Sequence, residues 1–475
     1  MSNFSFRSWV LHLAKTSRVA VIDKPVSLQH ELAAVAKILD GRQASFFTKP
    51  GQHQIPVISG FMSQRSWIAE AMGVPESELL ETFRRAADRP RDCNLISSAP
   101  CQEVQIRSDI DLTRLFPIPV HSEHDNGPYI TAGLIIARNA RTGIQNVSIN
   151  RLQVHSNNRL GILMLPRHLH SFYKDAEEKG DALSVAIVIG VDPLTLLASQ
   201  AILPINVDEL RVSSALHKNP LEVVRCISSD IDVPAMSEIV IEGRLLPRER
   251  ALEGPFGEFP KYYSARENRE IIEVDAITHR RNPIFHTIIP AEMEHLLLGA
   301  IPREATILSF LQRSFPGVLD VRLAVGGVCR YHLYVKFKKK REGEPKNVIM
   351  GAFASHYDVK HVVVVDEDVN IHNATEVEWA IATRFQAERD LVVVHGAQGS
   401  PLDPSTTVAD ASVGLTDVTL ERQGITSKLG FDATKPTAYE GHVFTRVKIP
   451  GEDTIDVTAY VSPMDLAAIN ATFKD

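Results

Sequence analysis

Two glutamates and one arginine in this sequence could handle a proton. The segment Glu253-Gly-Pro-Phe-Gly-Glu258 contains two glycines and a proline, which force a tight loop that can bring both carboxylates into one pocket. A carboxylate beside Arg151 would stay ionised, whereas the second, if partly desolvated, could hold a proton near neutral pH and donate it. Taken by itself, the motif is better explained by a loop with two exposed glutamates.

Three further side chains could bind a divalent cation. Asn146 lies in a predicted strand, His168 near the start of a predicted helix, and Glu209 in a short helical segment. An amide oxygen, an imidazole and a carboxylate together suit Mn²⁺ or Mg²⁺ and leave coordination positions for phosphate oxygens. Spacing along the chain supports this set only weakly.

The predicted strand that contains Asn146 also affects the direction in which Arg151 points. Asn146, Ser148 and Asn150 would share one face of a strand, because side chains alternate between faces. Arg151 would then point to the other face unless the strand bulges or ends there. Strand geometry alone leaves both arrangements open.

Helical elements precede these residues. Apolar residues at helical spacing predict an amphipathic helix over 28–39, with Glu31 in its first turn and Gly41 just past its end. A second helical section is predicted over 70–87, and the Ser-Ser-Ala-Pro stretch that follows breaks regular structure. We therefore place a domain boundary near residue 112.

The middle of the chain is rich in strands, and the last part alternates strands with helices. A barrel or packed sheet is expected from strands predicted at 130–137, 147–154, 183–190, 238–245 and 271–277. Beyond residue 305, an α/β domain is expected from a helix at 306–315 followed by segments at 331–337, 361–365, 376–386 and 391–395. The tail segment 463–473 has a helical pattern.

Composition excludes several classes of function. The chain has 475 residues, 44% of them hydrophobic, and a net charge of −7, so it lacks the positive field that nucleic acid or an anionic membrane would require. No apolar run is long enough to span a membrane. The four cysteines lack CxxC spacing, and the first residues do not resemble a secretory signal. These features predict a cytoplasmic protein with reduced thiols and no nucleic-acid or membrane partner.

Common catalytic motifs are absent from the sequence. His30-Glu31 is followed by Ala34 where a zinc-protease helix needs a second histidine. The chain also lacks the P-loop, the dinucleotide fingerprint and the nucleophile elbow. The chemistry must therefore rest on the groups described above.

Several motifs together carry a resemblance to a known family. They follow one another in the family's order: Asn146-x-Ser-x-x-Arg151, Pro-x-His168, Glu209 ahead of Ser-Ser-Ala-Leu216, Val233-Pro-Ala-Met-Ser-Glu238, Glu253-Gly-Pro-Phe-Gly-Glu258 and Ser427-Lys-Leu-Gly-Phe-Asp432-Ala-Thr434. The chain resembles the UbiD-type decarboxylases, which use prenylated flavin mononucleotide (FMN), from about residue 5 to residue 440. The resemblance implies a carboxy-lyase that removes CO₂ from an aromatic or heteroaromatic acid through a covalent adduct with this cofactor.

The resemblance implies a role for each matching residue. Arg151, Glu253 and Glu258 match the catalytic set, with Glu258 as the proton donor. Cofactor-binding positions are implied for Asn146, Ser148, Ile149, Arg151, Arg167, His168 and Lys428. A divalent metal, Mn²⁺ or Mg²⁺, is implied at Asn146, His168 and Glu209, and K⁺ near Ala198 and Ser199. Arg167 either contacts the phosphate or pairs with an acid outside the site.

The resemblance also implies a multidomain α+β and α/β fold. An N-terminal α/β domain (1–112) and a C-terminal α/β oligomerisation domain (306–475), the latter reached through a linker helix, flank a β-rich, split-barrel-like domain (113–305) that binds prenylated FMN. A flavin prenyltransferase would supply the cofactor. A homodimer or homohexamer is expected.

The segment from Glu292 to Arg303 is similar to a heteroaromatic-acid subgroup of the family. His295 and Arg303 are eight residues apart, so they can share one side of a helix. As a cationic pair they could bind a second polar group, such as the distal carboxylate of furan-2,5-dicarboxylate. Indole or pyrrole carboxylates would fit if His295 only hydrogen-bonds a ring group, and a structural pair that caps the linker helix is an equally good explanation. Phenolic or α,β-unsaturated acids, or a non-catalytic flavin-binding subunit, are the alternatives.

Overall fold

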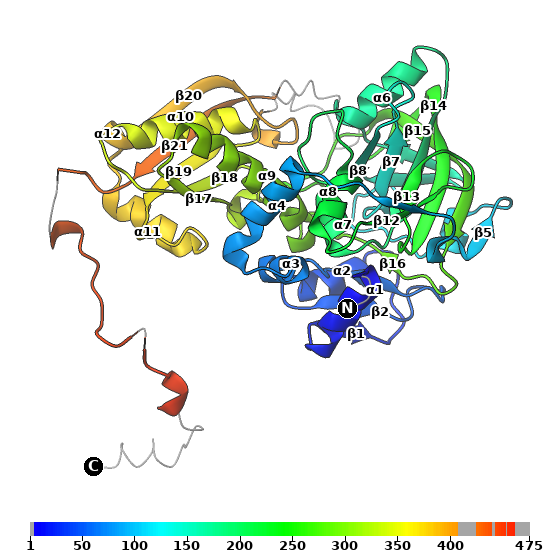
Figure 1. The fold of residues 1–475 in the computed structure, drawn as a ribbon, viewed down its shortest axis with the longest axis horizontal. Helices are drawn as coiled ribbons and strands as arrows, with labels where there is room; N and C mark the ends of the chain where they lie inside the picture. Colours follow the sequence, from blue (N-terminus) through cyan, green and yellow to red (C-terminus); the bar gives the residue numbers. More distant parts are fainter. Residues whose placement is uncertain (1–3, 407–423, 439–441, 453, 461–475) are drawn as a thin grey trace.

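The computed structural model describes residues 4–406, 424–438, 442–452 and 454–460. Figure 1 shows the N-terminal helices and sheet at the bottom, the large central sheet above them, and the C-terminal sheet to the side. No helix within these described ranges is both long and apolar enough to span a membrane. The fold is mixed α/β and multidomain, as predicted from the sequence.

The N-terminal elements form a small sheet covered by helices. The sheet has the order β1 (Val19–Ile22), β2 (Ala44–Phe47), β3 (Val57–Ser59) and β16 (Phe285–His286), so a strand from much later in the chain completes it. The helices are α1 (Phe6–Lys15), α2 (Glu31–Leu39), α3 (Arg65–Met72) and α4 (Leu79–Asp88).

Two predicted helical segments differ from the observed ones for local reasons. Helix α2 begins at Glu31 instead of residue 28, because His30 has a left-handed backbone (φ 68°) and Gln29 forms a bridge with Val120. The section predicted over 70–87 is split, because Gly73 caps α3 in a left-handed conformation (φ 73°) and ends it before α4 starts.

The central sheet is antiparallel and holds most of the strands. In order, they are β6 (Tyr129–Ile130), β9 (Leu152–Ser156), β10 (Arg159–Ile162), β15 (Glu267–His279), β14 (Ile239–Glu253), β11 (Leu183–Ile189), β7 (Leu134–Arg138) and β8 (Gln145–Ile149), with β5 (Val104–Ile106) beside β15. The inward-facing residues of these strands form a continuous hydrophobic core. The sheet does not close, because β6 and β8 form its two edges in the described chain.

The chain itself crosses the gap between the two edges. Strand β8 lies at one edge, whereas β9 lies next to the other edge, and only Asn150 and Arg151 connect them. Three peptide units span at most about 11 Å, so the sheet must curl until its edges nearly meet. We call this place the seam. The continuous strand predicted over 147–154 is therefore wrong at its middle, and Arg151 lies in the connection.

Short elements flank the central sheet. Strands β13 (Asp232–Pro234), β12 (Glu222–Arg225) and β4 (Asn94–Ile96) form a small separate sheet. The helices are α5 (Leu112–Leu115), α6 (His168–Glu177), α7 (Pro193–Ala198) and α8 (Glu209–Leu216). Helix α7 has Asp192 as its N-cap, which accepts hydrogen bonds from the next backbone N–H groups.

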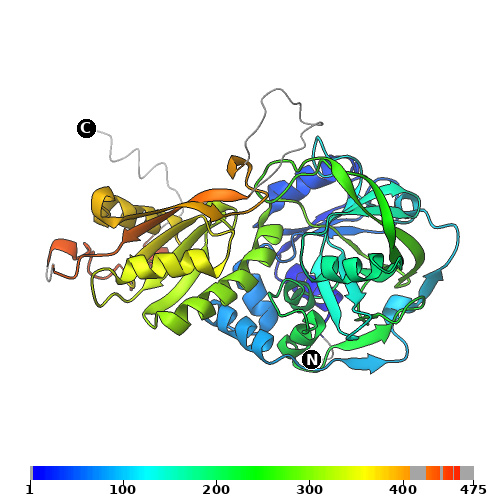
Figure 2. The ribbon, with the colours of Figure 1, turned by 90° about the horizontal axis from the view of Figure 1, so that it is seen from above.

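A long helix leads to the C-terminal part. Helix α9 (Met293–Ser314) continues through Pro302 and runs beside α4 and β17, between the C-terminal sheet and the rest of the molecule (Figure 2). The sequence predicted only its last part, 306–315, because proline usually ends a helix. The C-terminal sheet has the order β17 (Val318–Leu323), β18 (His332–Phe337), β19 (His361–Asp366), β21 (Ile425–Ala433) and β20 (Leu391–Gln398). Its helices are α10 (Glu344–Ser355), α11 (Ala374–Arg384) and α12 (Ala387–Asp390).

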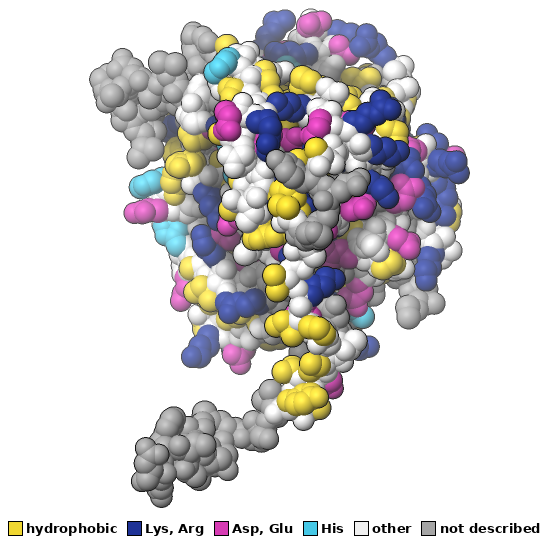
Figure 3. Space-filling view, turned by 90° about the vertical axis from the view of Figure 1, so that its left-hand side faces the viewer, with side chains coloured by type: hydrophobic (Ala, Val, Ile, Leu, Met, Phe, Trp, Pro, Cys, Tyr) yellow, Lys and Arg dark blue, Asp and Glu magenta, His cyan; other side chains and the backbone are white. Residues whose placement is uncertain are grey.

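An extended segment leaves the C-terminal sheet. Figure 3 shows hydrophobic side chains along it. In this segment Val447 is 97% exposed and Tyr460 is 77% exposed. The helix predicted over 463–473 lies outside the described residues. The domain boundaries predicted at residues 112 and 305 stay predictions, although β4 and β16 each pair with a strand on the other side of residue 112.

Candidate active site

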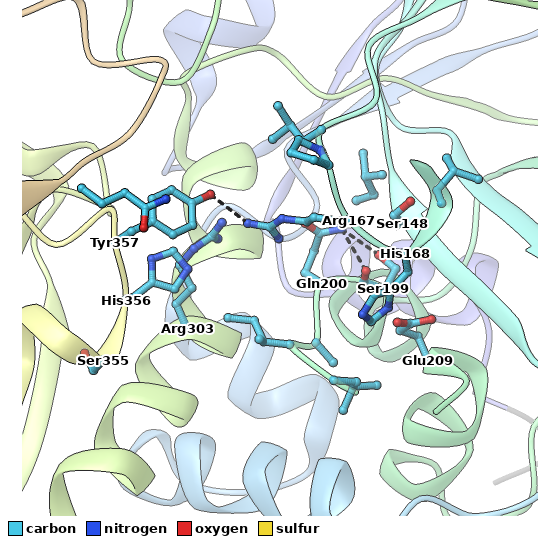
Figure 4. Close-up of a pocket in the computed structure, with 18 of the residues that line it drawn as sticks. Ser148, Arg167, His168, Ser199, Gln200, Glu209, Arg303, Ser355, His356 and Tyr357 are labelled. Atoms are coloured by element: carbon cyan, nitrogen blue, oxygen red, sulfur yellow. Dashed lines mark hydrogen bonds between the residues drawn. The ribbon is translucent and has the colours of Figure 1, made fainter. Parts of the chain in front are cut away.

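A cavity of about 1190 Å³ lies between the central sheet and the C-terminal part. We call it the main cavity. Strand β8, the start of α6 and the start of α8 form one wall, and α9 and the end of α10 face them (Figure 4). Its lining comprises residues 146–150, 164–169, 199–203, 209, 303, 350, 353–357, 394, 397–398 and 428.

The three predicted metal ligands all border this cavity. Glu209 is buried and accepts hydrogen bonds from the Asn146 amide (3.1 Å) and from the backbone N–H of Val147 (2.7 Å). Burial raises the pKa of Glu209 to about 8, which favours a nearby cation if this carboxylate is to remain ionised. Burial and the adjacent Arg167 lower the pKa of His168, so its ring is neutral and able to bind a metal.

The chemistry of this donor set fits a hard or borderline divalent ion. Oxygen from Asn146, nitrogen from His168 and oxygen from Glu209 come together on one wall. Among the described residues, no cluster of three His, Cys, Asp or Glu side chains surrounds a common metal position. A metal here would therefore depend on the Asn146 amide as its third protein ligand.

Other predicted cofactor contacts lie along the same wall. Ser148 and Ile149 border the cavity, and the Ser148 hydroxyl donates to the Asn150 side chain at 2.8 Å. Ser199 also borders it, with its hydroxyl donating to the backbone oxygen of Leu196 at 2.7 Å. Ala198, predicted with Ser199 to lie near K⁺, is buried in α7 and is absent from the lining.

Several cationic side chains face the cavity from its two walls. Arg167 reaches across the cavity and donates to the Tyr357 hydroxyl at 3.1 Å, and Lys428 donates to the Tyr357 backbone oxygen at 3.0 Å (Figure 4). Arg303 and His356 also face the cavity. Of the side chains that line it, only Glu209 is acidic, so the space favours anionic ligands.

Arg303 is ion-paired with Asp358 but does not use all of its hydrogen-bond donors. Its Nη1 donates to the backbone oxygen of Gly299 at 2.6 Å, but its Nε has no hydrogen-bond partner and lies 3.8 Å from Asp358 Oδ2. Burial and the nearby Arg330 lower the pKa of Arg303 to about 9, so the guanidinium is charged at pH 7. A buried charge with an unused donor favours an anion as its ligand.

His295 differs from the cationic partner expected from the sequence. Its side chain is buried, its Nδ1 accepts a hydrogen bond from the Ala291 backbone at 3.1 Å, and it does not border the main cavity. Burial, together with the nearby arginines, lowers the pKa of His295 to about 3. Of the predicted pair His295 and Arg303, only Arg303 borders the cavity, and its side chain is charged.

The three predicted catalytic residues form one ion-pair cluster. Arg151 donates to both carboxylate oxygens of Glu253, at 2.9 Å and 2.7 Å, and to Glu258. Burial lowers the pKa of Arg151, but the two glutamates outweigh it and raise that pKa above its usual range. The guanidinium lies 5.2 Å from the ring centroid of Phe256. The position of Arg151 in the seam lets it meet both glutamates.

These three residues are not part of the described lining of the main cavity. The turn at Asn150 connects the two groups, because Asn150 borders the cavity and Arg151 follows it directly. The ion-pair cluster therefore lies immediately beside the cavity wall.

The loop that carries both glutamates is held by residues that sequence reasoning missed. Gly254 has φ 87°, and a Cβ there would lie 2.8 Å from the Ala265 backbone oxygen, which explains the glycine. Gln153 accepts hydrogen bonds from the Gly254 N–H (3.0 Å) and from the Tyr129 hydroxyl (3.0 Å). Asp125 accepts from the Gly257 N–H at 2.9 Å. No local sequence pattern marks these long-range contacts.

Comparison with known proteins identifies related domains over most of the chain. Residues 10–87, 94–293 and 296–433 match the N-terminal, Rift-related and C-terminal domains of 3-octaprenyl-4-hydroxybenzoate carboxy-lyase, the UbiD domains. The chain is 39% identical to an anhydromevalonate phosphate decarboxylase from Methanothermobacter thermautotrophicus, covering 88% of this chain and 94% of that protein. It is 37% identical to one from Methanosarcina mazei, covering 94% and 100%.

Solved structures share the fold. The UbiD-class enzyme HmfF from Pelotomaculum thermopropionicum, in complex with FMN, is 46% identical, with a TM-score of 0.92 over 96% of this chain and 100% of that one. A 3,4-dihydroxybenzoic acid decarboxylase from Enterobacter cloacae is 28% identical, with a TM-score of 0.84 over 94% and 97%. The matched domains and this similarity extend across the central sheet, the main cavity and the C-terminal sheet. The chain therefore belongs to the UbiD family of carboxy-lyases.

Proposed function

We propose that this enzyme catalyses the reversible, non-oxidative decarboxylation of a heteroaromatic carboxylic acid of the furan, indole or pyrrole type, with prenylated FMN as its cofactor. The observation that carries the substrate part is Arg303, a guanidinium on the cavity wall that is 14% exposed and whose Nε has no hydrogen-bond partner beside its ion pair with Asp358. A substrate with a second anionic group would satisfy that donor.

The main cavity suits a flavin phosphate and its metal. Its volume of about 1190 Å³ lies at the upper end of ligand sites, where a cofactor and a small acid fit together. Asn146, His168 and Glu209 would hold Mn²⁺ or Mg²⁺ at the phosphate, and Ser199, with the backbone of Ala198, would lie near K⁺. Arg167 and Lys428 would add positive charge around the same ligand. When bound, prenylated FMN supplies an electron sink for the bond that loses CO₂.

The protein residues then have defined tasks. Arg151 would orient the substrate carboxylate and hold Glu253 beside it through two hydrogen bonds. Glu258, 12% exposed and in contact with Arg151, would deliver a proton to the carbon that CO₂ leaves. In the carboxylation direction, favoured at high CO₂, Glu258 would remove that proton.

The metal assignment predicts a specific loss of affinity. His168→Ala should weaken Mn²⁺ binding by more than about 100-fold, because even partners that only orient a metal ligand contribute about 10–100-fold. Titration of the purified chain with Mn²⁺ in the presence of FMN would measure this. His170→Ala, on the same helix but outside the cavity lining, is the control. Equal Mn²⁺ affinity in the two variants would contradict the assignment.

The substrate assignment predicts a change in preference. Arg303→Met should reduce kcat/KM for furan-2,5-dicarboxylate by about 10–100-fold, because one charge-assisted hydrogen-bonded pair to the distal carboxylate is lost. Turnover of furan-2-carboxylate should change little. Arg313→Met, on the exposed end of the same helix, controls for general effects. If the preference for dicarboxylates is unchanged, a second carboxylate does not bind at Arg303.

A phosphate-bearing acid is the second candidate substrate. Several relatives at 32–39% identity are anhydromevalonate phosphate decarboxylases, and a phosphate group would also satisfy the cationic wall around Arg303. Phenolic and α,β-unsaturated acids without a second anion would leave the Arg303 donor unused. A non-catalytic flavin-binding subunit would have no need for the assembled ion-pair cluster.

One experiment separates these candidates. The chain would be co-expressed with a flavin prenyltransferase and incubated without oxygen, with Mn²⁺ and K⁺, while CO₂ release is recorded from furan, pyrrole, indole, phenolic and phosphate-bearing unsaturated acids. Release from a furan, pyrrole or indole acid supports the proposal. Release only from the phosphate ester favours the second candidate, and bound flavin with no release from any acid favours the non-catalytic subunit.

We also propose a cytoplasmic homodimer or homohexamer. The apolar side chains along the extended segment after β21 are exposed in the single chain, Val447 almost completely. A second copy of this chain would bury these apolar side chains in an interface between the two copies.

A further inference from the structure

Phe259 directly follows Glu258 and is buried between two side chains of the C-terminal part. The guanidinium of Arg330 lies 5.2 Å from its ring centroid, and the ring of Tyr331 lies 5.7 Å away. Arg330 and Tyr331 come from the segment between β17 and β18, far from Phe259 in sequence. Phe259, the residue next to the proposed proton donor, therefore packs against the C-terminal part of the molecule.

Arg330 is itself held in place. Its Nη1 donates to the backbone oxygens of Cys329 (2.9 Å) and Leu296 (3.3 Å), the latter on α9. Val328 and Cys329 both have left-handed backbones, with φ of 50° and 53°, which sets the direction of the turn before Arg330. Arg330 is only 5% exposed. Because little water screens its charge there, its cation–π contact with Phe259 is stronger than such a contact at the surface.

Helix α9 has a glycine where Arg330 packs against it. A Cβ at Gly299 would lie 1.6 Å from Nη2 of Arg330, so only glycine leaves room for the guanidinium in this position. The carbonyl of Gly299 also accepts a hydrogen bond from Arg303. One turn of α9 thus supports both the arginine that faces the cavity and the arginine that covers Phe259.

Arg151 and Asp125 hold the loop from the central part of the molecule through the Glu258 side chain and the Gly257 N–H, and the remaining backbone hydrogen bonds of Glu258 are local. Its N–H donates to the Tyr262 carbonyl at 2.9 Å, and its own carbonyl accepts from the Lys261 N–H at 2.9 Å. These bonds shape the loop but tie it only to itself. The contact at Phe259 connects the loop to the C-terminal part.

We propose that Arg330 is a positioning residue that sets the place of Glu258 through Phe259, and that Gly299 is required because it admits the Arg330 guanidinium. This inference rests on the proposed function of Glu258 as the proton donor. Arg330 acts without touching the reacting atoms. Its effect is to hold the carboxyl group of Glu258 in a fixed position beside Arg151.

Gly299→Ala provides the sharpest test, because it keeps every charge. The new methyl group meets the far end of a flexible side chain, so the chain should fold with the guanidinium of Arg330 displaced. Hydrogen exchange of the amides in 256–264 of the purified full-length chain should rise by about tenfold, as expected for the loss of one buried cation–π contact. Arg330→Met should give the same local increase, and Arg330→Lys should restore part of the protection.

Kinetics distinguish positioning from a purely structural role. With furan-2-carboxylate, which does not use Arg303, we expect kcat to fall by about tenfold in both variants with little change in KM, because proton delivery suffers more than binding. The pH profile of kcat should shift in the same two variants. Arg250→Met removes a similar contact over Tyr173, at 5.4 Å and far from Glu258, and should change neither.

Two results would overturn the inference. The first is unchanged exchange in 256–264 for both Gly299→Ala and Arg330→Met. The second is faster exchange spread evenly over the C-terminal sheet, which would show a general stabilising role. Full activity of a Glu258→Gln variant would instead refute the proposed proton donor, so the two failures can be told apart.

Discussion

Glu258→Gln is expected to lower kcat for decarboxylation by about 10²–10⁴-fold, the usual contribution of a positioned general acid. The amide keeps an oxygen that can accept the hydrogen bond from Arg151, so the ion-pair cluster should keep its shape. What the variant lacks is the proton itself. Loss of CO₂ release, measured at saturating substrate with cofactor content verified by absorbance, is the expected result.

A matched glutamate provides the control for this experiment. Glu249 lies on β14, the same strand that ends at Glu253, but its side chain is 51% exposed and pairs with Arg159 at the surface. Glu249→Gln should retain activity within about twofold, as surface substitutions usually do. If Glu258→Gln turns over as fast as Glu249→Gln, another group must donate the proton.

Arg151→Met is expected to give the largest loss of stability. It leaves the carboxylates of Glu253 and Glu258, 1% and 12% exposed, without their counter-ion. Breaking a buried pair from one side costs about 3–5 kcal/mol, because an uncompensated charge remains. For a domain of this size we expect Tm to fall by roughly 6–20 °C in calorimetry.

Two further variants test the reason for that loss. Arg159→Met removes an arginine that is 42% exposed and paired with Glu249 and Glu273, and should lower the free energy of unfolding by only about 0–1 kcal/mol. The double variant Arg151→Met with Glu253→Gln should recover part of the loss, since it also removes one stranded charge. A Tm for Arg151→Met equal to that of Arg159→Met would refute the explanation.

Local patterns in the sequence were sufficient to predict the class of fold and several site groups. A continuous run of apolar, β-branched residues predicted β11, and the glycines and proline of Glu253-Gly-Pro-Phe-Gly-Glu258 predicted the tight loop that brings both glutamates to Arg151. Asn146, His168 and Glu209 do border one cavity. The strand and the loop could be predicted because one short segment determines each of them, whereas Asn146, His168 and Glu209 lie far apart in the sequence and were grouped by the family resemblance.

The missed features depend on distant parts of the chain. Strand β16 pairs with β3 more than two hundred residues earlier, and α9 continues through Pro302 because it packs along much of its length. The low pKa of His295 results from desolvation inside the fold and from the nearby Arg330 and Arg303, which its neighbours in sequence do not reveal. Burial and long-range pairing arise only when the whole chain has folded.

The seam of the central sheet has a consequence for how the protein behaves before it binds its ligands. Strand β8 pairs with β7 on one side only, and its other edge belongs to the cavity wall. An unpaired strand edge is a template for aggregation, which proteins usually cover with a helix, a charge or a bulge. Here Glu209 occupies part of the edge by accepting the Val147 N–H, and a bound cofactor would cover more of it. The same edge that receives the ligand is thus one that a bound ligand would protect from pairing with another chain.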